Sequence, residues 1–213
     1  MGRRKKIYVL VACEESQRVA TAFRQKGCVA FSADLEKCRG KHPEYHIMGD
    51  VTPLLKGKKS FLVQSGQRRK VPRFDILIAH PPCTFLCKVS SVWMIKKNIL
   101  NVNRFKKMIE ARKFFYLCLN ADFPYIAVEN PLPMARAKLP QPTTWVQPWQ
   151  FGHPYSKKTL LWLKNLPPLF PTKIMANYKE FVHSSRGKYR SRTFPGIANA
   201  MADQWTDYVL QNR

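Results

Sequence analysis

Two short segments of the sequence place a reactive side chain directly after an apolar run. The segment His80-Pro81-Pro82-Cys83 follows residues 74–79 and puts a thiol on a loop stiffened by two prolines. The segment Glu129-Asn130-Pro131 follows residues 125–128 and puts a carboxyl group at the end of the next apolar run. A thiol and an acid that meet can perform covalent catalysis, with the cysteine as nucleophile and the acid protonating or orienting the substrate. Cys83, Glu129 and Asn130 are therefore the candidate catalytic residues.

Other readings of these cysteines stay open. Cys83 can also be a small buried side chain on an ordinary loop, and Cys83 with Cys87 can be half of a zinc site. No second Cys or His pair stands at ligand spacing, because His42 with His46 is a weak candidate, so we predict no metal. The six cysteines are scattered along the chain, which favours a reduced cytoplasmic compartment.

The apolar patterns predict strands that alternate with helices. Gly27 ends the helix of a first strand–helix–strand unit, and the later strands run into polar loops. This order predicts an α/β protein with a doubly wound, mostly parallel sheet, whose ligands bind outside the carboxyl ends of the strands. The expected strands are residues 7–12, 29–32, 74–79, 125–128 and 159–163, and the expected helices are residues 18–26, 103–119 and 197–208.

The composition bounds the size and the partners of the protein. Its 213 residues, 45% of them hydrophobic, suit one folded domain and exclude a disordered basic tail. A signal peptide and a membrane span are not expected, because no apolar run is long enough. Lysine and arginine number 37 against 13 acidic residues, a net charge of +24 that favours a nucleic-acid partner. Basic groups recur at residues 3–6, 56–59, 68–73, 96–97, 104–107 and 186–192.

The ordered motifs resemble those of the DNA cytosine-5 methyltransferases, and more closely their compact phage and prophage forms. Pro81-Pro82-Cys83 is similar to the Pro-Cys nucleophile motif, and Glu129-Asn130-Pro131 to the Glu-Asn-Val motif. Residues 7–27 resemble the cofactor motif, and residues 192–200 resemble the C-terminal motif that closes the cofactor pocket. The resemblance implies a fold of the S-adenosylmethionine-dependent methyltransferase type over residues 1–213, with a basic insertion at 56–73 and a short segment at 171–191 in place of a target-recognition domain.

The resemblance also implies a chemistry and a set of binding residues. Cys83 would add to carbon 6 of a flipped-out cytosine while Glu129 holds ring nitrogen 3, and S-adenosylmethionine would methylate carbon 5. The partner would be DNA, single- or double-stranded. The implied cofactor-binding residues are Ala12, Cys13, Glu14, Ser16, Asp34, Asp50, Pro81 and Asn199, and the implied substrate-binding residues are Pro82, Thr84, Lys157, Lys158, Arg190 and Arg192.

The sequence departs from this family at three places. Residues 13–17 contain no glycine, Lys157-Lys158 stand where the family has paired arginines, and the short segment at 171–191 predicts poor sequence selectivity. Two alternatives therefore remain: a methyltransferase acting on an exocyclic amine, and a catalytically silent, basic nucleic-acid-binding protein of the same fold. Among the aromatic residues, we expect Trp145, Trp162 and Trp205 in the core, and His153 and Trp149 in a structural, buried role.

Overall fold

The computed structural model describes residues 6–96, 99–181 and 192–212, and a seven-stranded sheet forms its centre. Five strands are parallel neighbours, and the penultimate strand, β12, is antiparallel to both strands beside it. In order across the sheet the strands are β3 (His46–Met48), β2 (Val29–Asp34), β1 (Tyr8–Ala12), β6 (Ile76–Ala79), β9 (Tyr125–Asn130), β12 (Thr159–Lys164) and β10 (Thr144–Val146).

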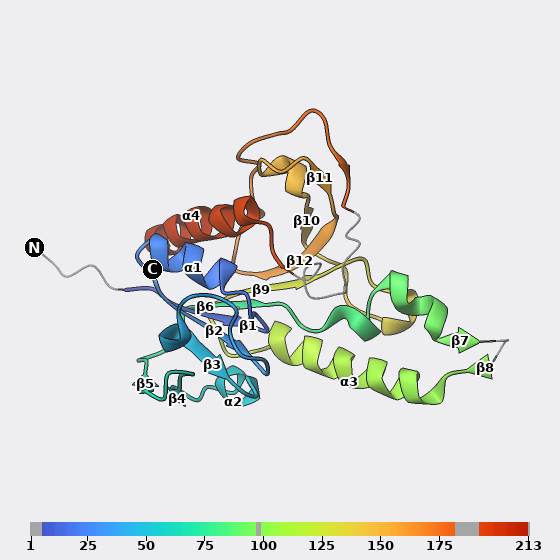
Figure 1. Cartoon of the computed structure of the whole chain (residues 1–213), viewed down its shortest axis with the longest axis horizontal. Coiled ribbons are helices and arrows are strands. Elements are labelled where there is room, and N and C mark those ends of the chain that lie inside the picture. Colours follow the sequence, from blue (N-terminus) through green and yellow to red (C-terminus); the bar gives the residue numbers. More distant parts are fainter. Residues whose placement is uncertain (1–5, 97–98, 182–191, 213) are drawn as a thin grey trace, which may run out of the picture.

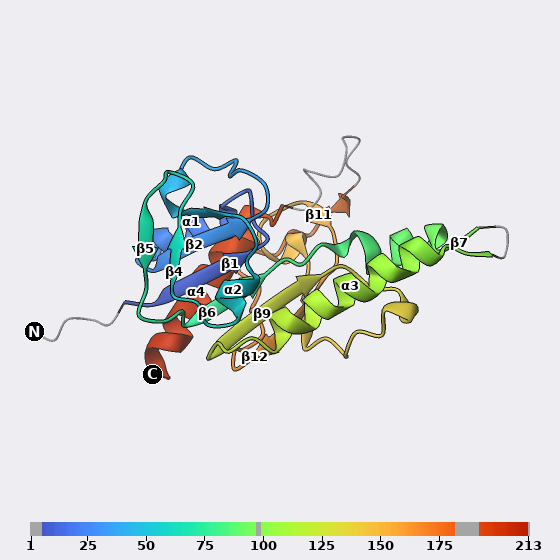
Figure 2. The ribbon, with the colours of Figure 1, turned by 90° about the horizontal axis from the view of Figure 1, so that it is seen from below.

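Helices cover both faces of this sheet (Figures 1 and 2). The helices α1 (Arg18–Gln25) and α4 (Pro195–Gln211) pack on one face, and α2 (Thr52–Leu55) and α3 (Val102–Leu119) on the other. Since side chains alternate along a strand, Val9 and Val11 of β1 join the α1 and α4 side, whereas Leu10 and Ala12 join the α3 side. The predicted α/β class with a doubly wound, mostly parallel sheet is confirmed.

The direction of chain progression reverses at β1. From β1 the chain builds outward through β2 to β3, and it then returns to place β6 and β9 on the other side of β1. In sheets of this kind the ligand site lies outside the carboxyl ends of the strands at that reversal. The topology therefore directs attention to the loops after β1, β2, β6 and β9.

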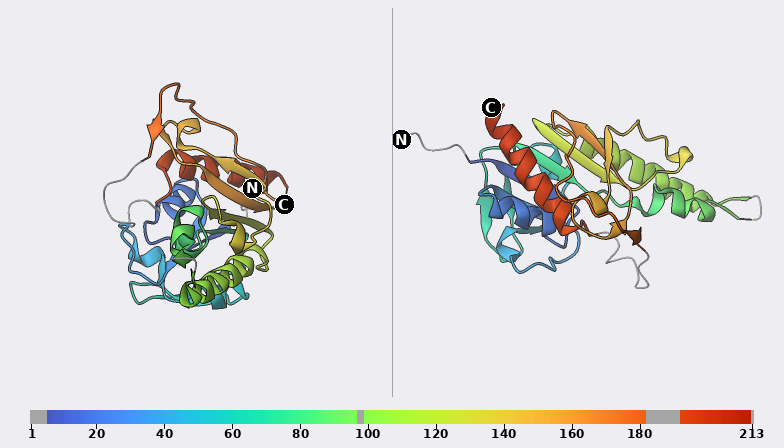
Figure 3. Two further views of the ribbon diagram at one scale, coloured as in Figure 1. Left: turned by 90° about the vertical axis from the view of Figure 1, so that its right-hand side faces the viewer. Right: turned by 90° about the horizontal axis from the view of Figure 1, so that it is seen from above.

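Small additional elements surround the sheet. The basic segment at 56–73 forms an antiparallel hairpin of β4 (Ser60–Leu62) and β5 (Arg68–Lys70), which is attached to the core by the buried Phe61 and Val71. A second hairpin, β7 (Ile95–Lys96) with β8 (Ile99–Leu100), extends beyond the start of α3 (Figures 2 and 3). Beside α4, β11 (Tyr155–Ser156) pairs in parallel with β13 (Lys179–Glu180). The short 3-10 turns are η1 (Pro43–Tyr45), η2 (Cys83–Phe85), η3 (Lys88–Trp93), η4 (Ala135–Ala137) and η5 (Pro148–Gln150).

The sequence prediction of buried tryptophans and of a buried His153 is wrong in part, because Trp149 and His153 are only partly buried. Trp162 and Trp205 are buried as expected, but Trp145 on the edge strand β10 is 44% exposed, and Lys158 Nζ lies 5.1 Å from its ring centroid. At the edge of the sheet fewer neighbouring elements cover the face on which Trp145 lies, so its side chain remains partly open to solvent. No helix in the described ranges is long and apolar enough to cross a membrane.

Candidate active site

The candidate site begins at the ends of two neighbouring parallel strands. Ala79 of β6 pairs with Val128 of β9, so the next residues, His80 and Glu129, lie side by side. Both face the α1 and α4 side, because Ile78 and Ala127, two residues earlier, pack there. His80 Nδ1 donates a hydrogen bond to Glu129 Oε2 at 2.8 Å, and the two side chains are only 11% and 13% exposed. The strand ends thus hold a nearly buried histidine–carboxylate pair.

Charges around the pair favour its ionised form. Burial lowers the pKa of His80, but the carboxylates of Glu129 and Glu14 together raise it more, so the net shift is upward. Burial raises the pKa of Glu129, but His80 and the ammonium of Lys157 lower it more, so the net shift is downward. Both shifts favour a protonated His80 beside an ionised Glu129.

Asn130, the third candidate catalytic residue, does not join this pair. Alternation along β9 directs it to the α3 face, where it is buried and its Nδ2 donates to the Pro131 carbonyl at 2.6 Å. Its Oδ1 has no hydrogen-bond partner among the described residues. The strand thus separates the two candidate side chains onto opposite faces of the sheet.

The loop after β6 is fastened beside the end of β9. The Lys88 amide donates to the Leu132 carbonyl and the Met134 amide to the Leu86 carbonyl, both at 2.7 Å, so the two post-strand loops are joined through their backbones. From the α3 side, Arg104 Nη2 donates to the Thr84 carbonyl at 3.2 Å. This frame keeps Cys83, the first residue of η2, next to the Glu129 strand end.

The thiol of Cys83 interacts electrostatically with both Glu129 and Lys157, and it also hydrogen-bonds the thiol of Cys87. Hydrogen bonding to Cys87 and burial raise the pKa of Cys83. The hydrogen bonds from Cys83 and Ser90 overcome burial and lower the pKa of Cys87 to about 5. The two thiols are thus a coupled pair, in which their mutual hydrogen bond favours ionisation of Cys87 over ionisation of Cys83.

Several candidate cofactor residues meet at the carboxyl ends of β1, β2 and β3. Cys13 follows β1. Burial raises the pKa of its thiol, and the nearby Cys118 thiol and the carboxylates of Asp34 and Asp50 raise it further. The backbone amides of Glu36 and Thr52 donate to Asp34 and Asp50, both at 2.9 Å, which orients the two carboxylates. Ala12 and Pro81 are buried at the ends of β1 and β6. Asn199 lies on the exposed surface of α4.

The glycine-free loop between β1 and α1 is shaped by its own side chains. Cys13 and Gln17 adopt positive φ values of 59° and 57°, conformations that glycine usually supplies. Glu14 is buried and accepts hydrogen bonds from the Val19 and Ala20 amides at 2.6 and 3.1 Å. Gln17 Nε2 donates to Ser32 Oγ and to the His42 carbonyl, while Ser16 Oγ makes only 3.5 Å contacts. The Glu14 carboxylate therefore occupies the amino end of α1, where other doubly wound folds place a phosphate.

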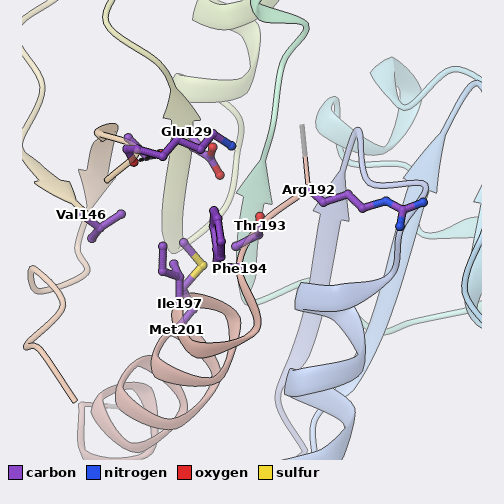
Figure 4. A pocket seen from close by; sticks show the side chains of 9 residues that line it. Glu129, Val146, Arg192, Thr193, Phe194, Ile197 and Met201 are labelled. Atoms are coloured by element: carbon purple, nitrogen blue, oxygen red, sulfur yellow. Dashed lines mark hydrogen bonds between the residues drawn. The ribbon is translucent and has the colours of Figure 1, made fainter. Parts of the chain in front are cut away.

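The candidate substrate residues separate into two groups. Lys157 joins Glu129 in lining a small pocket closed by Val146, Phe194, Ile197 and Met201 (Figure 4). Arg192 also lines this pocket, while its side chain points away from Glu129 in the same view and its Nε lies 3.9 Å from Glu15 Oε1. Lys158 lies against Trp145, Pro82 and Thr84 are exposed, and Arg190 lies outside the described residues.

Two residues of the candidate site, His80 and Gln17, are not singled out by the sequence analysis. His80 was read only as part of the loop that presents Cys83, although a histidine directly after a buried strand is itself a signal. Gln17 carries no such signal, because its role depends on Ser32 and His42, which reach it only in the folded chain.

No protein-family model matches the sequence, and no curated protein matches it. Among solved structures, the fold is similar to that of an E. coli prophage-encoded protein described as a DNA modification methyltransferase, with 13% identity, a TM-score of 0.48, and 80% of this chain and 52% of that chain covered. It is also similar to the S. pombe Dnmt2 methyltransferase, with 12% identity, a TM-score of 0.38, and 82% and 52% covered. The chain spans about half the length of each.

Proposed function

We propose that the protein is an S-adenosylmethionine-dependent DNA methyltransferase that acts on carbon 5 of cytosine. The observation that carries this proposal is the convergence of Cys83 and Glu129, where the thiol and the carboxyl group interact at the ends of adjacent strands, with Lys157 beside both. A nucleophile next to an acid is the pair that covalent addition to a pyrimidine ring requires.

The roles follow from the chemistry of the ring. Carbon 6 of cytosine accepts the Cys83 thiolate only when ring nitrogen 3 is protonated or firmly hydrogen-bonded, and this role is assigned to Glu129 because it interacts with Cys83. Lys157 supplies a positive charge that favours the thiolate of Cys83. The target base must leave the helical stack to reach this edge of the sheet.

The carboxyl ends of β1 to β3 suit a cofactor that has hydroxyl groups and a positive charge. Asp34 and Asp50 form no ion pair with any described residue, although the chain carries a net charge of +24. Glu14 at the amino end of α1 repels a phosphate, which disfavours a dinucleotide but not S-adenosylmethionine. S-adenosylmethionine would supply an electrophilic methyl group, with Asp34 accepting hydrogen bonds from its ribose.

Trapping with DNA that contains a mechanism-based cytosine analogue, in the presence of the cofactor, tests the reaction. We expect a covalent complex with the wild-type protein and none with Cys83→Ala, while DNA binding stays within about threefold because phosphate contacts are retained. Cys38→Ala, which removes a thiol distant in sequence from the site, is the matched control and should trap normally. Cys83→Ala with normal methyl transfer would refute the proposal and favour methylation of an exocyclic amine.

Calorimetry tests the cofactor site separately. Asp34→Ala should weaken S-adenosylmethionine binding about tenfold, because a hydrogen bond to a charged group contributes roughly 1.5–3 kcal/mol, and should leave DNA binding unchanged. Glu36→Ala removes the exposed acidic residue two positions later and serves as control. Equal cofactor affinity in the wild type and Asp34→Ala would place the cofactor elsewhere, and no binding to either protein would favour the silent nucleic-acid-binding alternative.

A further inference from the structure

His80 stands between two buried carboxyl groups. Glu129 accepts a hydrogen bond from His80 Nδ1 at 2.8 Å. The charge of Glu14, a residue of the β1–α1 loop that is 4% exposed, also acts on His80. Its other ring nitrogen, Nε2, is buried and has no hydrogen-bond partner among the described residues. A fully structural histidine in such a position uses both nitrogens, as His46 does with Ser32 Oγ and the Glu36 carbonyl.

The proposed function makes a demand that Glu129 alone does not meet. A carboxyl group that protonates ring nitrogen 3 must hold a proton when the thiolate attacks, but Glu129 is kept ionised by His80 and Lys157. The 2.8 Å contact and the opposite pKa shifts of the two groups favour a proton on His80 Nδ1, one hydrogen bond away from the carboxylate that needs it.

We propose that His80 is a positioning residue that stores the proton which Glu129 passes to the target base. This inference rests on the proposed function and goes beyond it, since it assigns the source of the proton. It also explains why a histidine, rather than an apolar residue, ends the buried strand β6 directly before the prolines.

The proton and electron movements balance as follows. As the Cys83 thiolate forms its bond to carbon 6, the π electrons shift through carbons 5 and 4 to nitrogen 3. Nitrogen 3 takes a proton from the Glu129 carboxyl, and Glu129 takes the Nδ1 proton of His80, which becomes neutral. When carbon 5 has accepted the methyl group and lost its own proton to a base, Cys83 leaves and the nitrogen 3 proton returns through Glu129 to His80. The pair is thereby restored.

The groups that face His80 come from three elements. They are Glu129 of β9, Glu14 of the β1–α1 loop, and Lys157 of the turn between β11 and β12. The carboxylates of Glu129 and Glu14 raise the pKa of His80, and the ammonium of Lys157 lowers it. Of these three groups Glu129 also hydrogen-bonds the imidazole ring, so its removal should change the pKa of His80 most.

Nuclear magnetic resonance of ring-labelled histidine tests the pair without any reaction. The chain has five histidines, and the resonance absent from His80→Gln identifies His80. In the wild type this resonance should remain that of an imidazolium above pH 7, and in Glu129→Gln its midpoint should fall by about one pH unit or more. A His80 that titrates at or below the ordinary histidine value, or is unmoved in Glu129→Gln, overturns the proposal.

The pH profile of single-turnover methyl transfer tests the use of the proton. His80→Gln should move the alkaline limb of the profile to lower pH and slow the reaction at pH 8 by at least about tenfold, with a smaller loss at pH 6. His42→Gln is the matched control, because His42 pairs with Glu44 at 3.0 Å but both are exposed, so it should leave the profile unchanged. An equal loss at every pH would show a purely structural role and overturn the proposal.

The two measurements distinguish the possible failures. A protein that makes 5-methylcytosine, but whose alkaline limb stays in place in His80→Gln, refutes the proton role and leaves the proposed function intact. A wild-type protein that forms no methylcytosine, although His80 titrates as an imidazolium coupled to Glu129, refutes the proposed function instead.

Discussion

At the residue scale, the two cysteines after β6 differ in how readily their thiols ionise. The proposed covalent addition needs the thiolate of Cys83, which lies beside Glu129 and Lys157, but the hydrogen bond between the two thiols favours the negative charge on Cys87. Contacts with Ser90, whose Oγ lies 3.6 Å from Cys87 Sγ, also lower the pKa of Cys87. A Cys87 thiolate can accept the Cys83 proton through the hydrogen bond between the two thiols, so this coupling controls how readily Cys83 becomes the nucleophile.

Alkylation with iodoacetamide followed by peptide mass spectrometry should report this order. Because hydrogen bonding lowers the pKa of Cys87 to about 5, we expect it to be labelled before Cys83 at pH 6 to 7. Cys87→Ala removes the hydrogen bond that raises the pKa of Cys83, so the labelling rate of Cys83 at pH 8 should increase about tenfold.

Cys118 provides the internal control for this experiment. It is fully buried, and burial raises the pKa of its thiol to about 12, so it should remain unlabelled in the folded protein. Faster labelling of Cys83 than of Cys87 in the wild type would contradict the assigned order of the pair.

At the scale of elements, the amino end of α4 is joined to the loop that contains η5. The Gly196 amide donates to His153 Nε2 at 2.9 Å, and a Cβ at Gly196 would collide with the Phe151 carbonyl. Arg18 Nη1 of α1 donates to the Thr193 carbonyl at 3.0 Å and fastens the same junction to α1. This junction places Phe194 and Ile197 in the pocket beside Glu129.

The junction should weaken in acid. Burial and the charge of Arg18 lower the pKa of His153, so its neutral form is favoured in the folded state. The neutral His153 therefore stabilises the folded state fully above the unfolded pKa of about 6.5, and this contribution is lost as the pH falls through the lower pKa of the folded state. Protonation removes the acceptor at Nε2 and puts a positive charge at the amino end of a helix, which costs about 1 kcal/mol.

Urea unfolding from pH 5 to 8 measures this effect. His153→Gln keeps an acceptor that takes no proton, so its free energy of unfolding should fall less between pH 7.5 and 5.5 than that of the wild type. Gly196→Ala should destabilise by about 2 kcal/mol or more at every pH, whereas Asn199→Ala on the exposed side of α4 should have little effect. An unchanged pH slope in His153→Gln would assign the acid sensitivity to other groups.

At the scale of the whole molecule, we expect the positive charge to dominate the proposed DNA binding. A net charge of +24 on 213 residues is spread over the hairpin β4–β5, the start of α3 and other segments, whereas the short segment at 171–191 offers few groups to read bases. Contacts of lysine and arginine with phosphate carry no sequence information directly. We therefore expect affinity without strong sequence selectivity.

DNA binding measured between 50 and 300 mM salt should show a steep dependence. Each neutralised phosphate contributes about −0.9 to the slope of log affinity against log salt, so about six contacts give a slope near −5 on duplex DNA. A slope shallower than about −2, or modification confined to one motif of about six base pairs or more, would reveal a base-reading element, for which the hairpin at 56–73 is the first candidate.

The sequence by itself determined the sheet and the strand ends that carry the candidate site. Buried apolar runs that end in polar loops predict parallel strands, and the carboxyl ends of successive strands lie at one edge, so Cys83 and Glu129 were predicted to meet. The boundaries agree within about two residues for most elements; for example, a predicted helix at 103–119 is found at Val102–Leu119. The short edge strands β3 and β10 were missed, because three residues carry too little periodicity.

Only the tertiary structure decided which side chains act on one another. The register of β6 and β9 pairs His80 with Glu129, and the alternation of β9 turns Asn130 to the other face, although it is the next residue in the chain. Glu14 and Gln17 replace the glycines of the β1–α1 loop through contacts with α1, Ser32 and His42. Hydrogen bonds and charge coupling act over a few ångströms, so they depend on distances that residue order does not contain.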